Sequence, residues 1–150
     1  MITLKLASSF DEIEFLFKAR TDPMIVKMLS GKPPKDMATH ISYINKNQGQ
    51  SRFIYIAYND KMEKIGYSQV YNITPGTVEV GFVIIPEYQG FKYGQSLVQE
   101  TINIAKTHFP QKNIVLCVKN SNHRGIHIYK KYGFVIIGVD EDLTYMSLSN

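Results

Sequence analysis

The chain has 150 residues, 44% of them hydrophobic and 20% charged, which is the composition of one globular domain with a single core. No apolar run is long enough to cross a membrane, residues 1–20 lack a signal-peptide pattern, and a single cysteine excludes an internal disulfide. The net charge of +4 comes mainly from scattered lysines, which favours small anionic ligands over nucleic acid or membranes. We expect a single cytoplasmic domain over residues 1–150, either monomeric or homodimeric.

The first third of the chain predicts one strand and two helices. Residues 2–6 alternate apolar and polar side chains, which is typical of a half-buried strand. Ser8 or Ser9 provides the N-terminal cap of a helix that the Asp22-Pro23 pair ends, unless that pair starts a new turn. A stiff basic loop over residues 30–35 precedes a second helix. The side chains expected on the buried faces of the two helices are Ile13, Leu16 and Phe17, and Met37, Ile41 and Ile44.

The rest of the chain mixes strands and helices in an order that predicts an α+β fold. Three strands over residues 53–58, 65–71 and 78–85 are joined by short turns, so the sheet begins antiparallel. A long helix over residues 93–108 follows them. We expect a mixed central sheet of about seven strands flanked by about four helices. The remaining elements are a strand over 114–118, a helix over 122–132 that Gly133 ends, and strands over 134–138 and 143–148.

The most informative segment joins the strand that ends at Ile85 to the long helix. Its sequence over residues 86–95 is PEYQGFKYGQ. The first turn of a helix has unpaired N–H donors and partial positive charge, and Gly90 and Gly94 have no Cβ to keep a phosphate away. Neither the dinucleotide pattern G-x-G-x-x-G nor the P-loop pattern is present. The segment predicts a diphosphate site of another class, with an ordinary strand-to-helix turn as the alternative.

Two motifs resemble the GNAT superfamily of acetyl-CoA-dependent N-acetyltransferases. Gln89, Lys92 and Gly94 occupy the marked positions of its acetyl-CoA loop, Q/R-x-x-G-x-G/A, although Lys92 stands where the family usually has glycine. Residues 122–134 resemble its segment N-x-x-A/G-x-x-x-Y-x-x-x-G-F. The resemblance covers roughly residues 54–137 and is nearest to the amino-sugar-nucleotide and ribosomal-protein acetyltransferase branches. It implies the GNAT fold and transfer of an acetyl group to a primary amine.

The resemblance also implies how acetyl-CoA, the acyl donor, is held without a metal ion. The backbone of Phe82, Val83 and Ile84 would pair with the pantetheine arm like an added strand. A local splay there would direct free N–H groups toward the thioester oxygen, and Asn122 would hydrogen-bond the same arm. The loop residues implied to bind the coenzyme are Gln89, Gly90, Phe91, Lys92, Tyr93, Gly94 and Gln95.

Two residues are candidates for the proton transfers of acetyl transfer. Glu79 shares one strand face with the apolar residues 81, 83 and 85, where desolvation would make its carboxylate a better base, acting directly or through a water. A salt bridge at the strand end is the alternative role for Glu79. Tyr129 would donate a proton to the departing thiolate. Its helical spacing alone fits a core aromatic residue, whereas its place in the second motif favours the catalytic role.

The cysteine and the histidines are expected to have no catalytic or metal-binding role. Some relatives that acetylate ribosomal proteins carry a glutamate base at the position of Cys117, so this departure disfavours the same peptide chemistry. Cys117 lies between Leu116 and Val118, which predicts a buried apolar residue. His123 and His127 share a helix without a third ligand, so no metal site is expected.

The acceptor amine is expected beside the first two helices, their connecting loop and the later strands. Basic and aromatic side chains there suit an acidic, phosphate-bearing acceptor with a ring. The leading hypothesis is the amino group of a nucleotide-linked amino-deoxysugar, at its 4-position. A protein N-terminus or lysine is the first alternative acceptor, and a non-catalytic acyl-CoA-binding module is the second alternative function. The candidate acceptor-binding residues are Arg20, Lys32, Lys35, His40, Tyr55 and Tyr71, although a structural role suits His40 somewhat better.

Overall fold

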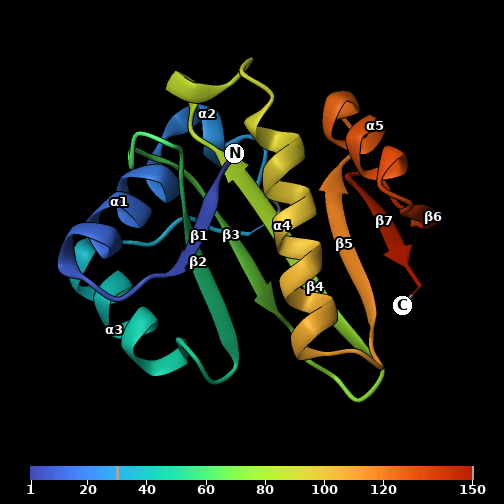
Figure 1. The fold of residues 1–150 in the computed structure, drawn as a ribbon, viewed down its shortest axis with the longest axis horizontal. Helices are drawn as coiled ribbons and strands as arrows, with labels where there is room; N and C mark the ends of the chain where they lie inside the picture. Colours follow the sequence, from blue (N-terminus) through green and yellow to red (C-terminus); the bar gives the residue numbers. More distant parts are fainter. Residues whose placement is uncertain (30, 150) are drawn as a thin grey trace.

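A seven-stranded sheet forms the centre of the computed structural model, which describes residues 1–29 and 31–149 (Figure 1). The strand order is β1-β2-β3-β4-β5-β7-β6. Among the described strands, only β4 and β5 are parallel neighbours, so the predicted mixed α+β architecture is confirmed. The strands are β1 (Thr3–Leu6), β2 (Arg52–Tyr58), β3 (Lys64–Tyr71), β4 (Thr77–Ile84), β5 (Asn113–Lys119), β6 (Val135–Val139) and β7 (Leu143–Leu148).

Five α-helices flank this sheet in the described part of the chain. One more is present than the four expected, because the Asp22-Pro23 pair starts a single helical turn of its own. A short 3-10 helix, Pro86–Tyr88, follows β4. The α-helices are α1 (Phe10–Thr21), α2 (Pro23–Val26), α3 (Met37–Asn47), α4 (Tyr93–His108) and α5 (His123–Lys131).

The two faces of the sheet pack against different helices. On β2, Ile54 and Ile56 pack with α1 and α3, whereas the alternate residues Tyr55 and Ala57 belong to the core on the α4 side. Figure 1 looks onto the face that α4 covers. α1 and α3 cover only part of the other face, and the strands that they leave open carry the polar residues described below.

The caps of the first helices explain where these helices begin. Ser9 and Glu12 form a reciprocal capping box at the start of α1, and Asp22 accepts hydrogen bonds from the first turn of α2. Of the side chains predicted for the buried face of α1, Ile13 and Leu16 are buried and Phe17 is half-buried against His40, and Glu12 is buried as well. The predicted basic loop over residues 30–35 begins at Ser30, which lies outside the described residues.

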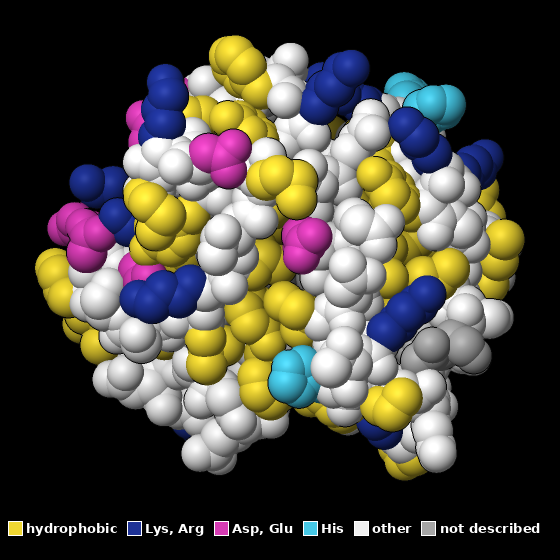
Figure 2. All heavy atoms as spheres, viewed as in Figure 1, with side chains coloured by type: hydrophobic (Ala, Val, Ile, Leu, Met, Phe, Trp, Pro, Cys, Tyr) yellow, Lys and Arg dark blue, Asp and Glu magenta, His cyan; other side chains and the backbone are white. Residues whose placement is uncertain are grey.

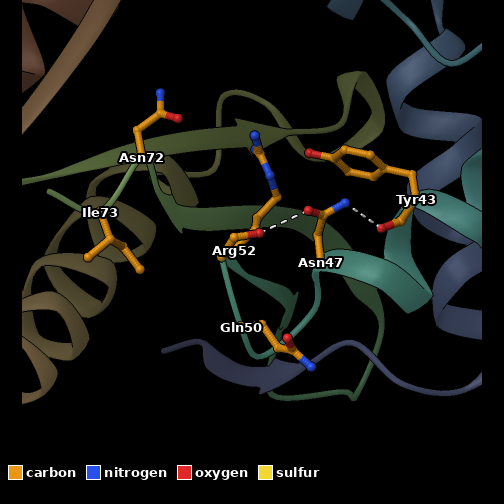
Figure 3. Close-up of a pocket in the computed structure, with 7 residues that line it drawn as sticks. Tyr43, Asn47, Gln50, Arg52, Asn72 and Ile73 are labelled. Atoms are coloured by element: carbon orange, nitrogen blue, oxygen red, sulfur yellow. Dashed lines mark hydrogen bonds between the residues drawn. The ribbon is translucent and has the colours of Figure 1, made fainter.

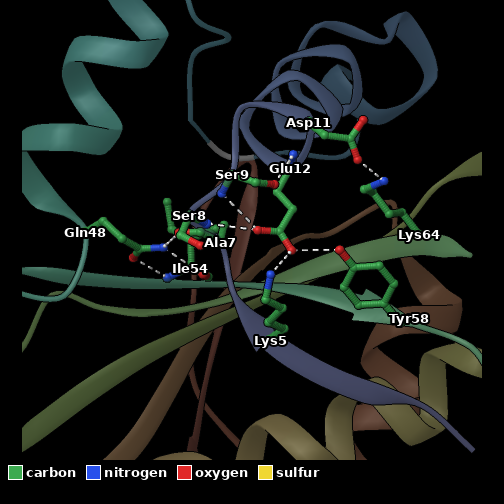
Figure 4. Close-up of polar contacts among 10 residues, drawn as sticks. All are labelled: Lys5, Ala7, Ser8, Ser9, Asp11, Glu12, Gln48, Ile54, Tyr58 and Lys64. Carbon is green, nitrogen blue, oxygen red and sulfur yellow. Dashed lines mark hydrogen bonds and ion pairs between the residues drawn. The ribbon is translucent and has the colours of Figure 1, made fainter. Parts of the chain in front are cut away.

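Glu12 joins α1 to the first two strands (Figure 4). Its side chain is 1% exposed, and its carboxylate accepts hydrogen bonds from the Tyr58 hydroxyl at 2.7 Å and the Lys5 ammonium at 3.0 Å. It also accepts from the backbone N–H groups of Ser8 and Ser9. Burial alone would raise the pKa of Glu12, but these hydrogen bonds outweigh it and lower the pKa to about 2. The buried carboxylate is therefore fully paired.

None of the described helices has the length and apolarity needed to span a bilayer. On the face shown in Figure 2, lysine and arginine side chains are spread around the rim and do not gather into one stripe. On this face, the positive charge is scattered, as expected from the sequence.

β4 and β5 separate after a short paired segment. Their parallel pairing covers only Thr77 to Glu79 opposite Asn113 to Val115. From Val80 to Ile84, β4 pairs with β3 alone among the described strands, while β5 continues beside β7. Figure 1 shows the two strands diverging toward their C-terminal ends. One edge of β4 is thus left with backbone N–H and C=O groups that no described strand uses.

Candidate active site

The segment between β4 and α4 presents the open helix N-terminus that the sequence predicts. α4 begins after Lys92 without a side-chain cap, so the N–H groups of its first turn have no capping acceptor. A Cβ built at Gly90 or Gly94 would meet no heavy atom within 4 Å, which leaves room for a ligand to approach the backbone. The Gln89 side chain donates a hydrogen bond to the Ile84 carbonyl at 2.9 Å, which ties this loop to the end of β4. The arrangement can hold an anion on backbone donors.

Lys92 adopts a left-handed backbone conformation, with φ of 66°. This is the position at which the acetyl-CoA loop motif usually has glycine. A residue with a Cβ pays roughly 1–2 kcal/mol for this conformation, whereas glycine adopts it without a steric penalty. The loop therefore keeps its shape with lysine at some cost in stability, and the lysine adds a positive charge beside the helix N-terminus.

Tyr129 lies on the α4 side of the gap between β4 and β5. Its ring contacts Phe82 of β4, with 5.5 Å between ring centroids, and Phe134 at 6.2 Å. Burial raises the pKa of Tyr129 to about 12, so the phenol stays protonated at neutral pH. Its hydroxyl makes no hydrogen bond to any described residue, which leaves it able to serve a ligand.

Asn122 has a structural role that the second motif also explains. Its side-chain oxygen accepts a hydrogen bond from the Gly125 N–H at 2.9 Å and so caps α5. A Cβ at Gly125 would lie 2.7 Å from the Asn122 amide nitrogen. Glycine at the fourth motif position therefore leaves room for the capping side chain. The amide nitrogen of Asn122 stays available for the predicted contact with the coenzyme arm.

Glu79 lies on the opposite face of the sheet from Tyr129, at the last residue before the two strands separate. Its carboxylate accepts hydrogen bonds from the Tyr71 hydroxyl at 2.7 Å, the Asn72 amide at 2.9 Å and the Cys117 thiol at 3.4 Å. Besides residues 81, 83 and 85 of its own strand, Glu79 therefore has polar partners from other segments that the sequence did not indicate. Burial and then the negative charge of Glu79 raise the pKa of Tyr71 far above its usual value, so Tyr71 acts only as a donor to Glu79.

Cys117 also departs from its prediction. It is half-buried and its side chain faces Glu79, whereas its neighbours Leu116 and Val118 are buried on the α4 side. The strict alternation of β5 separates these faces. No group of three metal-ligating side chains lies together among the described residues.

Two arginines, Arg52 and Arg20, extend the Glu79 cluster across the open face, and Figure 3 shows Arg52. The Arg52 guanidinium lies 4.2 Å from the centre of the Tyr71 ring and 5.5 Å from the Tyr43 ring, and it contacts the Gln69 side chain. The Arg20 guanidinium lies 5.5 Å from the same Tyr43 ring. Neither arginine pairs with a carboxylate in the described part of the chain. Their charges are thus available to an anionic ligand.

A cavity of about 510 Å³ opens beside Arg52, which is a size suited to a small-molecule ligand. Tyr43 and Asn47 come from α3, and Asn72 follows β3, so the cavity reaches the Asn72 side chain that donates to Glu79. Figure 3 shows the Arg52 side chain lying between Asn72 and Tyr43. The cavity is lined by Tyr43, Asn47, Gln50, Ser51, Arg52, Asn72 and Ile73.

The structure brings only part of the predicted acceptor set together. Tyr71 and Arg20 lie on the open face, but Tyr55 is buried in the core on the α4 side. His40 is 0% exposed, and its Nε2–H donates to the Ile13 carbonyl, which joins α3 to α1. Burial, then the charge of Arg20, lowers the pKa of His40, so it stays neutral in the core. Lys32 is exposed in the segment before α3 and joins no part of this cluster.

Three residues of the cluster were not anticipated: Tyr43, Arg52 and Asn72. A sequence signal existed for Arg52, because the strand alternation that buries Ile54 and Ile56 extends back to residue 52 on the same face. Its neighbour across the hairpin is Tyr71, a pairing that depends on the register between β2 and β3. No comparable periodicity in the sequence indicated that Asn72 or Tyr43 would join the cluster.

Comparisons with known proteins identify the family of the chain. The acetyltransferase (GNAT) domain model matches residues 2–135. Acetyltransferase PseH of Campylobacter jejuni is 28% identical over 151 residues, which cover 99% of this chain and 94% of PseH. The crystal structure of C. jejuni N-acetyltransferase PseH with acetyl coenzyme A is similar at a TM-score of 0.78 and 27% identity, over 100% of this chain and 99% of that one.

A second solved structure shares the fold at lower sequence similarity. Spermidine N-acetyltransferase from Vibrio cholerae, in complex with CoA and spermine, has a TM-score of 0.90 at 20% identity, over 98% of this chain and 94% of that one. Together with the family match, these similarities establish the reaction type and its acyl donor. The chain belongs to the GNAT acetyltransferases and is an acetyl-CoA-dependent N-acetyltransferase.

Proposed function

We propose that the chain transfers the acetyl group of acetyl-CoA to the primary amine of a nucleotide-linked amino-deoxysugar, by direct attack in a ternary complex. One observation carries the proposal: a row of Arg52, Tyr71 and Glu79 leads across the open face to the point where β4 leaves β5. The row offers positive charge at one end and a carboxylate at the other. The active unit is residues 1–150 as a single domain, and its cytoplasmic location stays a prediction.

The acyl donor enters from the α4 side. The diphosphate of the coenzyme would lie on the free N–H groups between Gly90 and Gln95, where no side chain caps the helix. The pantetheine arm would then follow the unpaired edge of β4 past Phe82, Val83 and Ile84. Both interactions use backbone groups, so they depend on the conformation of this segment more than on its side chains.

The acceptor enters from the open face. β4 and β5 separate after Glu79, so this residue stands where the two faces of the sheet can communicate. Glu79 would take a proton from the acceptor amine, directly or through one water, as the amine nitrogen bonds to the thioester carbon. The carbonyl oxygen becomes an oxyanion beside the free N–H groups of β4. The intermediate then collapses, the carbon–sulfur bond breaks, and the thiolate departs on the side of Tyr129.

Tyr129 is suited to stabilise that thiolate as a hydrogen-bond donor. Its pKa of about 12 keeps the proton on the phenol throughout the neutral range. A thiol has a pKa of about 8.5, so donating a hydrogen bond costs less than giving up the proton completely. The proton that completes the free thiol can follow from solvent.

The charge of the open face favours an anionic acceptor over a polyamine or a basic peptide. Arg20 and Arg52 have no acidic partner among the described residues, and Glu79 is the one carboxylate of the cluster. A polycation would meet two guanidinium groups before it reached the base. A diphosphate would instead be bound by them. The protein N-terminus or lysine alternative stays second, because no acidic groove accompanies Glu79 among the residues that the structure describes.

An amine panel tests the proposal. Purified chain is incubated with acetyl-CoA and, in separate reactions, a nucleotide-linked amino sugar, the same amino sugar without its nucleotide, spermidine and a basic peptide. Released thiol measures turnover against a reaction without amine. We expect the highest kcat/KM with the nucleotide-linked sugar. Faster turnover of spermidine or the peptide would overturn the acceptor assignment while leaving the reaction type intact.

A further inference from the structure

The two oxygens of the Glu79 carboxylate have different surroundings. Oε2 accepts two hydrogen bonds, from the Tyr71 hydroxyl at 2.7 Å and from the Cys117 thiol at 3.4 Å. Among the described residues, Oε1 accepts one, from the Asn72 side-chain amide at 2.9 Å. Each oxygen of an ionised carboxylate has about two lone-pair sites. The two donors therefore fill the sites of Oε2, whereas Oε1 keeps one site for a further donor.

The two donors to Oε2 come from the strands on either side of Glu79. Tyr71 of β3 is its direct partner in the antiparallel register. On β5 the direct partner is Val115, and Cys117 is the next residue on the same face of that strand. The parallel pairing ends at Glu79, so Tyr71 and Cys117 hold the carboxylate from both sides at the point where β4 and β5 separate.

Oε1 lies on the side of the cavity beside Arg52. Its donor, Asn72, lines this cavity. The hydrogen bond between Asn72 and Glu79 is exposed, whereas the bonds that Tyr71 and Cys117 make to Oε2 are partly buried. An amine that reaches the base from the cavity therefore meets Oε1 and not Oε2.

We infer that Tyr71 and Cys117 are positioning residues of acetyl transfer, which hold Oε2 of Glu79 so that the remaining lone-pair site of Oε1 takes the proton of the acceptor amine. The inference rests on the proposed role of Glu79 as base, and it adds which oxygen reacts and what fixes its direction. The N–H bond breaks as the amine nitrogen bonds to the thioester carbon, and the proton goes to Oε1, directly or through one water. A carboxylate that could rotate would spend less time in the productive orientation.

A hydroxyl deletion tests the inference. Tyr71→Phe removes one donor from Oε2 and keeps the ring against which the Arg52 guanidinium lies. We expect kcat to fall about tenfold, while KM for acetyl-CoA and for the amine changes less than about twofold. Tyr145→Phe is the matched control and should keep the wild-type kcat. Tyr145 pairs with Cys117 across β5 and β7, but its hydroxyl donates to Asp140 at 2.8 Å.

Substitutions of Cys117 test the second donor. Cys117→Ala removes the thiol and should lower kcat about threefold, since a thiol is a weaker donor than a phenol. Cys117→Ser keeps a donor of similar size and should restore most of the rate. All reactions use the amine of the panel above that the wild type turns over fastest, so the result does not depend on the acceptor assignment.

A double-mutant cycle with Glu79→Gln separates positioning from support of the fold. Tyr71→Phe should lower the residual kcat of Glu79→Gln no further, because the hydroxyl acts through the base. A second tenfold loss would mean that Tyr71 only supports the fold, and would overturn the inference. Circular dichroism confirms that each variant is folded.

The same variants distinguish failure of this inference from failure of the proposed function. If Glu79→Gln turns over at the wild-type rate, Glu79 is not the base and both are wrong. If Glu79→Gln is slow while Tyr71→Phe and Cys117→Ala keep the wild-type kcat, the base stands and only its positioning by these two residues is refuted.

Discussion

The donor end and the acceptor face of this enzyme are built from different parts of the chain. At the donor end, one continuous segment runs from the unpaired edge of β4 through Gly90 to the first turn of α4, and the groups that it offers are backbone N–H groups. At the acceptor face, Arg52, Tyr71 and Glu79 come from three neighbouring strands, and the groups that they offer are side chains.

This difference separates the donor end, which we expect members of the family to share, from the acceptor face, which can differ between them. Backbone donors depend on conformation, so the donor end tolerates Lys92 where the motif usually has glycine. Side-chain donors depend on identity and on register, so the acceptor face can change its ligand by single substitutions. In the proposed function, the reaction depends on the donor end and on Glu79, whereas the choice of amine depends on Arg52 and its neighbours.

The largest expected effect is at the junction of the two regions. Glu79→Gln removes the proposed base while it keeps the size of the side chain, and kcat should fall about 1000-fold. The binding of acetyl-CoA should stay unchanged, because the donor end uses backbone groups. Stopped reactions with thiol detection and calorimetry of acetyl-CoA binding measure the two quantities. Glu141→Gln, a matched change in the β6–β7 turn, is the control and should keep full activity. If Glu79→Gln turned over at a similar rate, Glu79 would not be the base.

A substitution of Glu12 tests how much its buried carboxylate stabilises the packing of α1 against β1 and β2. Glu12→Gln should lower the free energy of unfolding by about 3 kcal/mol at neutral pH, because the ionised carboxylate has a folded-state pKa of about 2 against 4.5 in the unfolded chain. The contribution of Glu12 is complete above pH 4.5 and is lost as the pH falls toward 2. Urea unfolding of the wild type and of Glu12→Gln at several pH values measures how the difference between their free energies of unfolding shrinks in acid. Glu14→Gln on the same helix is the control, and a difference that does not shrink in acid would refute the assignment.

Tyr129 tests the donor side of the reaction. Tyr129→Phe keeps the ring that packs on Phe82 and removes the hydrogen bond to the thiolate, so kcat should fall about 30-fold. Acetyl-CoA affinity should change little. The neighbouring change Tyr132→Phe should leave kcat as it is. If both variants turn over at the wild-type rate, the leaving thiolate does not depend on Tyr129.

Arg52 tests the acceptor side. Arg52→Gln should raise KM for the nucleotide-linked amino sugar about tenfold and leave KM for acetyl-CoA unchanged. Lys46→Gln removes an exposed positive charge from α3 and serves as the control for net charge. Steady-state kinetics with each substrate varied in turn separates the two KM values. An equal rise in both would mean that Arg52 supports the fold and does not select the acceptor.

The smallest expected effect concerns the loop backbone. Lys92→Gly should raise the free energy of unfolding by about 1 kcal/mol, because the left-handed conformation no longer carries a Cβ. Lys92→Ala removes the same charge but keeps the strain, so it should not stabilise the chain. Equal stabilities for the two variants in urea unfolding would show that the loop is not strained at this residue.

Local patterns predicted the fold well. The α4 helix spans Tyr93–His108 and β7 spans Leu143–Leu148, as expected, because periodicity and caps act within one segment. The acceptor face was harder to predict, since it depends on the pairing between strands. Tyr55 and Tyr71 both lie in strands rich in aromatic residues, yet the register pairs Tyr55 with Ser68 and Tyr71 with Arg52, which places the two tyrosines on opposite faces.

His40 illustrates a second limit of sequence reasoning. Its position beside the apolar stripe of α3 fits both a buried and a ligand-binding histidine. Only the packing of α1 over α3 decides between them, by burying the ring and supplying the Ile13 carbonyl. The hydrogen bonds to Glu79 were equally hard to predict, because Asn72 reaches the carboxylate from the turn after β3. Contacts between distant segments therefore decide the environment of both residues.

A crystal structure of the ternary complex tests the central claim most directly. The chain would be crystallised with a nucleotide-linked amino sugar and a non-reactive analogue of acetyl-CoA. The account predicts the amine nitrogen on the open face, within hydrogen-bond distance of the Glu79 carboxylate or one water away, with the acceptor diphosphate against Arg52. An acceptor bound elsewhere, with its amine beside a different base, would contradict it.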